Sequence, residues 1–169
     1  MKPEILFLKY AFPCTMIILQ RKEINQKTFD SLEKSSFSGK PAKREVLEKV
    51  YFRAISRMKA LAKEKNRDYF SEENIRDYFV TRHNEILDGN FADFQDKGLD
   101  IDKNAPPALK HLCKVFQSTI IKKGFDFYIV EYADNNVVKT RPVSNAILPD
   151  AELGDVVTIH YGYAIEKVS

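Results

Sequence analysis

The feature that most constrains this chain is a change in hydrophobic period about two thirds of the way along it. Residues 42–66 carry apolar side chains at helical spacing, from Val46 and Leu47 to Leu61 and Ala62. Beyond residue 110, short runs rich in β-branched and aromatic side chains favour strands instead. The sequence therefore predicts an α+β protein, with an N-terminal helical domain at 1–105 and a small β-barrel domain at 106–169.

Several signals divide the first part into helices. The apolar run 5–12 is closed by Pro13, which ends a helix because proline lacks the backbone donor. Residues 14–19 fit either a strand or a buried turn of helix. Ser71 is a plausible N-cap for a second amphipathic helix, which should stop near Gly89. Two amphipathic helices bury their apolar stripes against a common surface, which gives the helical domain.

The pattern of residues 106–169 predicts strands joined by tight turns. The segment 100–107 is polar and ends in two prolines, so it is predicted to be a linker. The predicted strand segments are 119–121, 125–132, 137–138 and 156–161, with a turn at 134–136. Several short strands within about 60 residues suggest a small closed or partly open barrel.

Composition and charge fit an ordinary globular protein. The net charge of +3 hides a basic segment at 40–67, net +7, beside an acidic segment at 68–104, net −6. This asymmetry indicates either solvated helix faces or a docking surface for a charged partner.

Glu4, Lys9 and Pro13 interrupt the apolar N-terminus, which argues against a signal peptide or a membrane span. A soluble, cytoplasmic protein is predicted.

Three histidines and two cysteines define the candidate metal ligands. His83 lies in a helical pattern and is read as a packed or surface residue. Cys14 follows Pro13 in an apolar stretch and is read as an inert buried thiol. Because there is no CxxC pair, the sequence predicts reduced thiols and no four-thiolate zinc site.

The remaining three residues form the predicted metal site. In an extended chain, His111 and Cys113 point to the same face, so an imidazole and a thiolate converge. His160 lies between Ile159 and Tyr161 in a strand, and it faces away from the barrel core if those two face inward. It is then directed toward solvent, a loop or a partner. Cys113, His160 and His111 are therefore the predicted metal ligands.

The segment 148–168, LPDAELGDVVTIHYGYAIEKV, closely resembles the terminal motif of the HypC/HupF family of NiFe-hydrogenase maturation chaperones. The resemblance extends back to Leu112-Cys113, where that family begins with Met-Cys, although here a long segment precedes the cysteine. It implies an OB-like barrel that binds a maturation scaffold protein and delivers an iron centre to the hydrogenase large-subunit precursor. Cys113 and His160 match the family's functional cysteine and histidine. Gly162, which allows close backbone approach, and Tyr163 are the predicted partner-binding residues.

Three functions follow from these patterns. The first is a non-enzymatic assembly chaperone that transiently shares iron with a partner. The second is a scaffold or regulatory protein that keeps the barrel without metal. The third, a nucleic-acid-binding module, would use Phe125, Phe127 and Tyr132 with neighbouring lysines, but acidic residues interleave that face. An enzyme is not predicted, because there is no phosphate-binding glycine loop, GxSxG elbow or HExxH helix.

Overall fold

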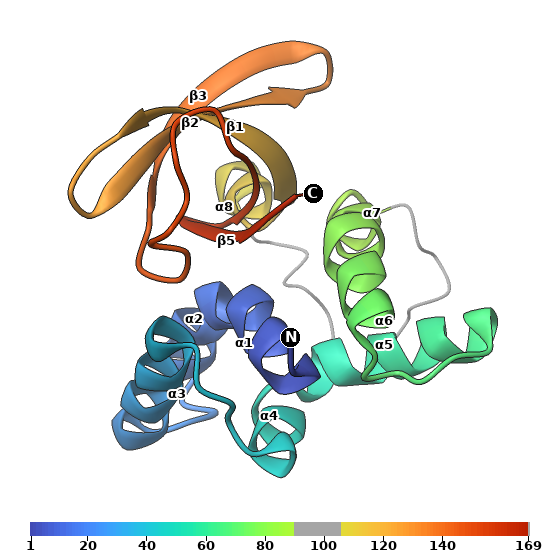
Figure 1. Ribbon diagram of the computed structural model, residues 1–169. Coiled ribbons are helices and arrows are strands. Elements are labelled where there is room, and N and C mark those ends of the chain that lie inside the picture. Colours follow the sequence, from blue (N-terminus) through green and yellow to red (C-terminus); the bar gives the residue numbers. More distant parts are fainter. Residues whose placement is uncertain (90–105, 169) are drawn as a thin grey trace.

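The computed structural model describes residues 1–89 and 106–168, and it contains helices first and strands last, as predicted. In Figure 1 the helical half, residues 1–89, lies below the C-terminal sheet and, at α6 and α7, to the right of it. Its elements are α1 (Pro3–Ala11), η1 (Phe12–Cys14), α2 (Thr15–Gln20), α3 (Gln26–Ser38), α4 (Arg44–Val50), α5 (Phe52–Lys65), α6 (Glu72–Arg76), η2 (Asp77–Arg82) and α7 (His83–Leu87). A short α8 (Pro107–Leu112) leads into β1 (Val115–Lys123), β2 (Phe127–Asp134), β3 (Val137–Ser144), β4 (Val156–His160) and β5 (Tyr163–Lys167).

The predicted helix boundaries are largely confirmed. Helix α1 ends at Ala11, and residues 14–19 are helical, with α2 beginning at Thr15. Ser71 caps α6, since its hydroxyl accepts the Asn74 N–H at 3.2 Å. The helix predicted over 42–66 is present but breaks at Tyr51, whose φ and ψ of −105° and 34° leave the helical region.

Helix α3 was not predicted from the sequence. It begins where the Asn25 side chain accepts the Thr28 N–H at 2.9 Å, and it ends at Gly39, whose φ is 62°. Phe29 and Leu32 are the only large apolar side chains of this helix that are buried. Two apolar residues are too few to show a helical period, so only the asparagine and the glycine at its ends indicate this helix in the sequence.

The five described strands form one sheet that closes into a ring, in the order β1-β2-β3-β5-β4. Neighbours pair antiparallel except β3 and β5, which join in parallel at Ser144 and Tyr163. The predicted turn between β2 and β3 is confirmed: Asn135 and Asn136 have φ of 49° and 63°, as a two-residue hairpin turn requires.

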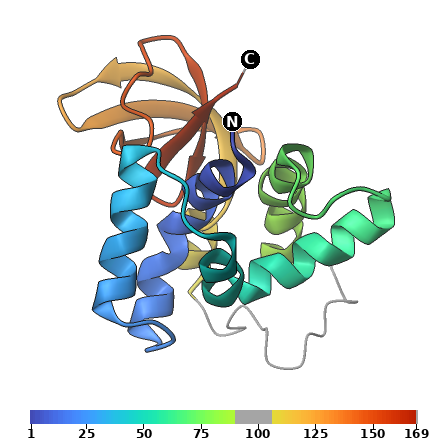
Figure 2. The ribbon, with the colours of Figure 1, turned by 60° about the horizontal axis from the view of Figure 1, so that its bottom comes forward.

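Two hydrophobic clusters lie within the described residues, and one of them spans the helical half and the C-terminal sheet. The interior of the ring is filled by Ile120, Tyr128, Val130, Tyr132, Val143, Ala151, Val157, Ile159 and Ala164. The core of the helical half includes three side chains from the other part of the chain, Val115, Ile147 and Ile165. Both ribbon views place α1 and α2 next to the sheet (Figures 1 and 2). The core of the helical half therefore extends across the boundary near residue 105, whereas the ring interior forms a separate cluster.

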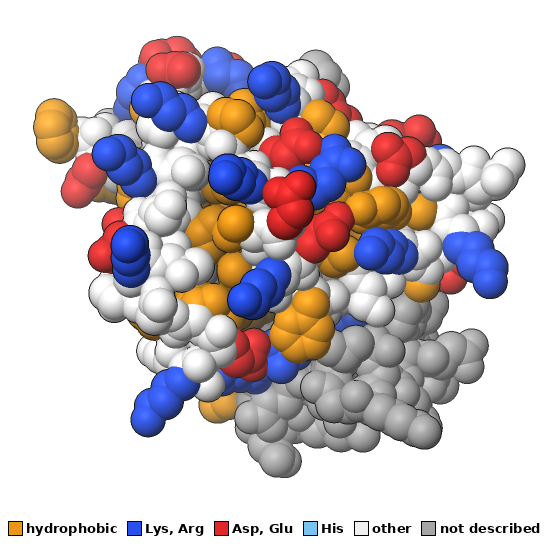
Figure 3. Space-filling view, turned by 90° about the horizontal axis from the view of Figure 1, so that it is seen from below, with side chains coloured by type: hydrophobic (Ala, Val, Ile, Leu, Met, Phe, Trp, Pro, Cys, Tyr) orange, Lys and Arg blue, Asp and Glu red, His pale blue; other side chains and the backbone are white. Residues whose placement is uncertain are grey.

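The basic and acidic segments pair with each other. Arg67, from the basic segment, bonds to Glu73 at 2.8 Å and to Asp77. Arg82, from the acidic segment, pairs with Glu64 of α5 at 2.7 Å. Figure 3 shows basic and acidic side chains intermingled on the side seen from below. This pairing agrees with solvated helix faces, the first of the two interpretations of the charge asymmetry.

Most of the predicted linker at 100–107 lies outside the described residues; its last residue, Pro107, begins α8. No helix within residues 1–89 or 106–168 has the length and apolar character needed to cross a membrane.

A partly buried network of hydrogen bonds joins α1 and α6 to β5 of the sheet. The Tyr10 hydroxyl donates to Glu166 of β5 at 2.6 Å, and Arg76 of α6 bonds the same carboxylate at 3.0 Å. The Tyr10→Phe variant should lose about 1–2 kcal/mol of unfolding free energy, because a charge-assisted buried hydrogen bond disappears. Urea denaturation measures the change. Tyr69→Phe, which removes a hydroxyl bonded to Glu48 nearer the surface, is the matched control; an equal loss in both variants would contradict the role assigned to Tyr10.

Candidate functional site

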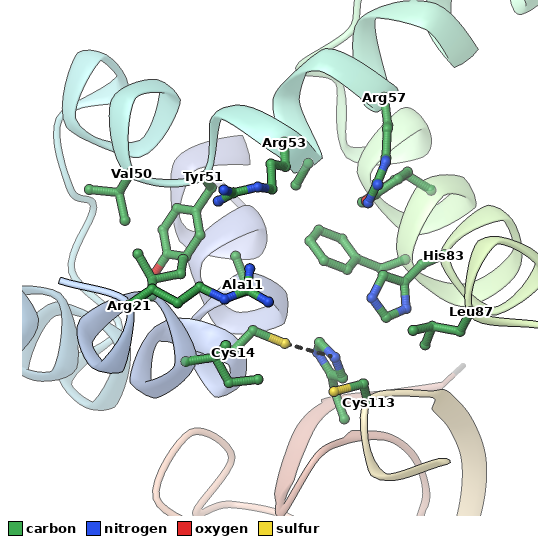
Figure 4. Close-up of a pocket in the computed structure, with 16 residues that line it drawn as sticks. Ala11, Cys14, Arg21, Val50, Tyr51, Arg53, Arg57, His83, Leu87 and Cys113 are labelled. Carbon is green, nitrogen blue, oxygen red and sulfur yellow. Dashed lines mark hydrogen bonds between the residues drawn. The ribbon is translucent and has the colours of Figure 1, made fainter. Parts of the chain in front are cut away.

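The predicted site residues Cys113 and His160 meet at a pocket between the helical half and the C-terminal sheet (Figure 4). The pocket is a cavity of about 170 Å³. Its floor carries both cysteines of the chain and two of its three histidines, Cys14, Cys113, His83 and His160. Apolar and aromatic side chains and three arginines complete the lining: Ala11, Ile17, Ile18, Val50, Tyr51, Ala54, Tyr78, Phe79, Leu87, Arg21, Arg53 and Arg57.

The two cysteines and two histidines of the pocket lie at the ends of four separate elements. Cys14 ends η1, directly after Pro13, at the corner between α1 and α2. Cys113 caps α8, where its N–H bonds to the Leu109 carbonyl at 3.0 Å. His160 is the last residue of β4, and His83 begins α7 directly after the π-helical segment η2. A π-helical segment has a wider turn, so it changes the direction in which the residues after it project.

His160 is held in one orientation and one tautomer. Its Nδ1 lies 2.7 Å from the Tyr10 carbonyl, and since a carbonyl only accepts, Nδ1 carries the proton. The lone pair on Nε2 then faces Cys14 Sγ at 3.6 Å. Burial lowers the His160 pKa to about 4, so the ring is neutral at pH 7. His160 faces away from the ring interior, where Ile159 lies, as predicted, but it is fully buried and contacts the helical half instead of solvent.

The two thiols are neighbours in this pocket. The Cys113 side chain and burial raise the Cys14 pKa, whereas the neighbouring Cys14 side chain lowers the Cys113 pKa. Figure 4 shows the two sulfur atoms pointing toward one another. Cys14 therefore belongs to the site, although the sequence interpretation set it aside as an inert thiol.

His83 is the second residue that sequence reasoning did not place in the site. Its ring centroid lies 5.3 Å from that of His160, in an edge-to-face arrangement. The side chain is 8% exposed, and its Nδ1 has no hydrogen-bond partner among the residues the structure describes. Burial, with the nearby charges of His160 and Arg57, lowers the His83 pKa to about 3. The signal available was its position on the same helical face as the buried Tyr78 and Phe79.

The structure does not bring His111 to this pocket. The residues before β1 are not extended, because Pro107 begins the helix α8, so His111 and Cys113 do not share a strand face. His111 instead contacts the Tyr132 hydroxyl, with Nε2 at 3.3 Å, and lies 5.4 Å from the Phe116 ring. The expectation that His111 and Cys113 converge was wrong for this reason.

The two predicted partner-binding residues lie at the turn that joins β4 to β5. Tyr163 is half-buried, and its ring lies 6.1 Å from the rings of Phe12 and Phe37, so it packs on the helical half. At Gly162, a Cβ atom would meet no atom of the described chain within 4 Å. The left-handed residue of the turn is Tyr161, with a φ of 56°.

The aromatic residues considered for nucleic-acid binding are split between surface and core. Phe125 is fully exposed, whereas Tyr132 is buried, with its ring 4.8 Å from Phe116. A continuous stacking surface through these two residues is therefore absent from the described sheet.

The donors that the structure describes do not form a preassembled metal site. Across residues 1–89 and 106–168, no group of three or more His, Cys, Asp or Glu side chains is arranged to hold a metal ion. Comparisons with protein-family models, curated proteins and solved structures gave no match. The geometry of the pocket and the motif at residues 148–168 are therefore the features that bear on function.

Proposed function

We propose that this protein is a non-enzymatic metallocluster-assembly chaperone that holds an iron centre transiently through Cys113 and His160 and shares it with a partner. The partner would be a hydrogenase maturation scaffold or a hydrogenase large-subunit precursor, as the sequence resemblance implies. The C-terminal sheet would then be the OB-like barrel of such a chaperone. The observation that carries this proposal is that Cys113 and His160, far apart in sequence, line one pocket.

The orientation of His160 supports a ligand role. Histidines that bind metals usually donate their other ring N–H to a carbonyl or carboxylate, which fixes the tautomer. The Nδ1 of His160 makes such a bond to Tyr10, which leaves the Nε2 lone pair directed at the sulfur of Cys14.

The chemistry of the donors suits a cargo site better than a permanent one. A thiolate and a neutral imidazole are ligands that iron accepts, and they leave most of its coordination sphere open. The lowered Cys113 pKa favours the thiolate that a metal requires. A site with so few ligands exchanges its metal with a partner more readily than a closed four-ligand site.

A metal-free scaffold is the second candidate, and the burial of His160 favours it. In that case Nδ1 and Nε2 are satisfied by Tyr10 and Cys14, and the pocket residues serve packing alone. The absence of a three-donor group among the described residues also agrees with this alternative.

An anaerobic titration with ferrous iron separates the two candidates, with cobalt(II) as a spectroscopic probe for thiolate ligation. The chaperone proposal predicts one bound ion with a thiolate charge-transfer band. Cys113→Ser and His160→Asn should each weaken binding at least about tenfold. His111→Asn, which removes an imidazole outside the pocket, is the matched control and should bind like wild type. Saturable binding that is unchanged in all three variants, or no binding at all, would favour the scaffold.

A further inference from the structure

Cys14 and Cys113 are neighbours across the boundary between the two parts of the protein. Cys14 belongs to η1 of the helical half, whereas Cys113 follows α8 at the entry to the C-terminal sheet. Both residues line the same pocket, and their sulfur atoms point toward one another there (Figure 4). The sequence has no other cysteine, so any disulfide within one molecule must join these two.

We propose that Cys14 and Cys113 form a reversible disulfide when the protein meets a two-electron oxidant such as hydrogen peroxide. One thiolate attacks the peroxide oxygen, the O–O bond breaks, and after protonation a sulfenic acid and one water result. The second thiolate attacks the sulfenic sulfur, the S–S bond forms, and the hydroxyl leaves as a second water. Two thiols and one peroxide thus give one disulfide and two waters, and an added dithiol reverses the change by exchange.

The pocket meets the requirements of this reaction. An S–S bond is about 2 Å long, so it needs the two sulfur atoms to be directed at one another, as they are in Figure 4. Cys14 is partly exposed, which gives a small oxidant access, and Cys113 is buried. The Nε2 atom of His160, 3.6 Å from Cys14 Sγ, can accept the thiol proton. Figure 4 shows both sulfurs at the pocket wall with this contact between Cys14 and the imidazole.

The disulfide would have two consequences. It would tie the helical half covalently to the C-terminal sheet, which limits separation of the two parts. It would also withdraw both sulfur donors from metal binding, a consequence that rests on the proposed function.

The test uses the reduced, metal-free full-length protein at low concentration, treated with hydrogen peroxide and then with an alkylating reagent. The proposal predicts loss of both alkylatable thiols and a mass decrease of two hydrogen atoms in the monomer. Peptide mapping should recover one cross-link between Cys14 and Cys113, which dithiothreitol reverses. The thermal midpoint should rise by several degrees on oxidation and fall back on reduction.

Cys14→Ser is the matched control, because it leaves Cys113 without a partner and should give sulfenic or sulfinic acid in place of the cross-link. Wild-type protein that gives only sulfinic acid, or only disulfides between two molecules, would overturn the proposal. Because no metal is present, this result is independent of the iron titration. A disulfide in a protein that binds no iron would support the switch while rejecting the chaperone function.

Discussion

Replacing Phe7 with alanine lowers the free energy of unfolding by about 3–5 kcal/mol, the range observed when a buried phenylalanine is truncated. Phe7 is fully buried in α1, and its ring centroid lies 5.3 to 5.9 Å from those of Tyr51, Phe70 and Phe79. These rings belong to the break between α4 and α5, the loop before α6, and η2. The Phe7 side chain therefore packs against three separate parts of the helical half. The cavity left by alanine cannot be filled without moving several of these rings.

Urea denaturation followed by circular dichroism measures this loss. Phe125→Ala is the matched control, because the Phe125 side chain is fully exposed and its removal should change stability by no more than about 0.5 kcal/mol. Similar effects of both substitutions would show that Phe7 is not at the centre of the core.

Acidification from pH 7 to pH 4.5 should lower the free energy of unfolding by about 3–5 kcal/mol, mainly through His83 and His160. Their folded-state pKa values are lowered to about 3 and about 4, below the usual 6.5. A histidine with a lowered folded pKa binds fewer protons when folded than when unfolded. Its contribution to the free energy of unfolding is therefore fully present above pH 6.5, and it is lost as the pH falls from 6.5 toward the pKa of the folded state.

Chemical denaturation at half-unit steps between pH 7 and pH 4.5 measures this dependence. His83→Leu removes one titrating group while keeping the site apolar, so it should reduce the slope in this range by about half. His111→Asn, at a residue that is partly exposed, should change the slope far less. If the stability of wild type is flat over this range, the two histidines are not buried in their neutral form.

The fold was predictable wherever one local pattern decided the outcome. Ser71 followed by two acids marked a helix start, and Asn135-Asn136 between apolar runs marked a hairpin turn. Helix α3 was missed because its stripe consists of Phe29 and Leu32 alone. The break at Tyr51 was missed because the apolar spacing continues through it.

The site was predictable in part, because sequence patterns do not report which elements pack together. The resemblance of the last segment selected Cys113 and His160, and these do line one pocket. Cys14 of η1 and His83 of α7 reach it because both lie beside His160 at the end of β4, which no local spacing encodes. His111 was assigned wrongly because the two prolines before it start a helix where an extended chain was assumed.

The most direct test of the account is an anaerobic pull-down from a lysate of a hydrogenase-bearing source, with metal analysis of the recovered protein. Wild type, Cys113→Ala and His160→Ala are compared, after circular dichroism has shown that each variant is folded. The account predicts that wild type recovers iron together with a maturation scaffold or large-subunit precursor, identified by mass spectrometry, and that both variants lose the iron. Equal behaviour of all three proteins, with no iron recovered, would contradict the chaperone function.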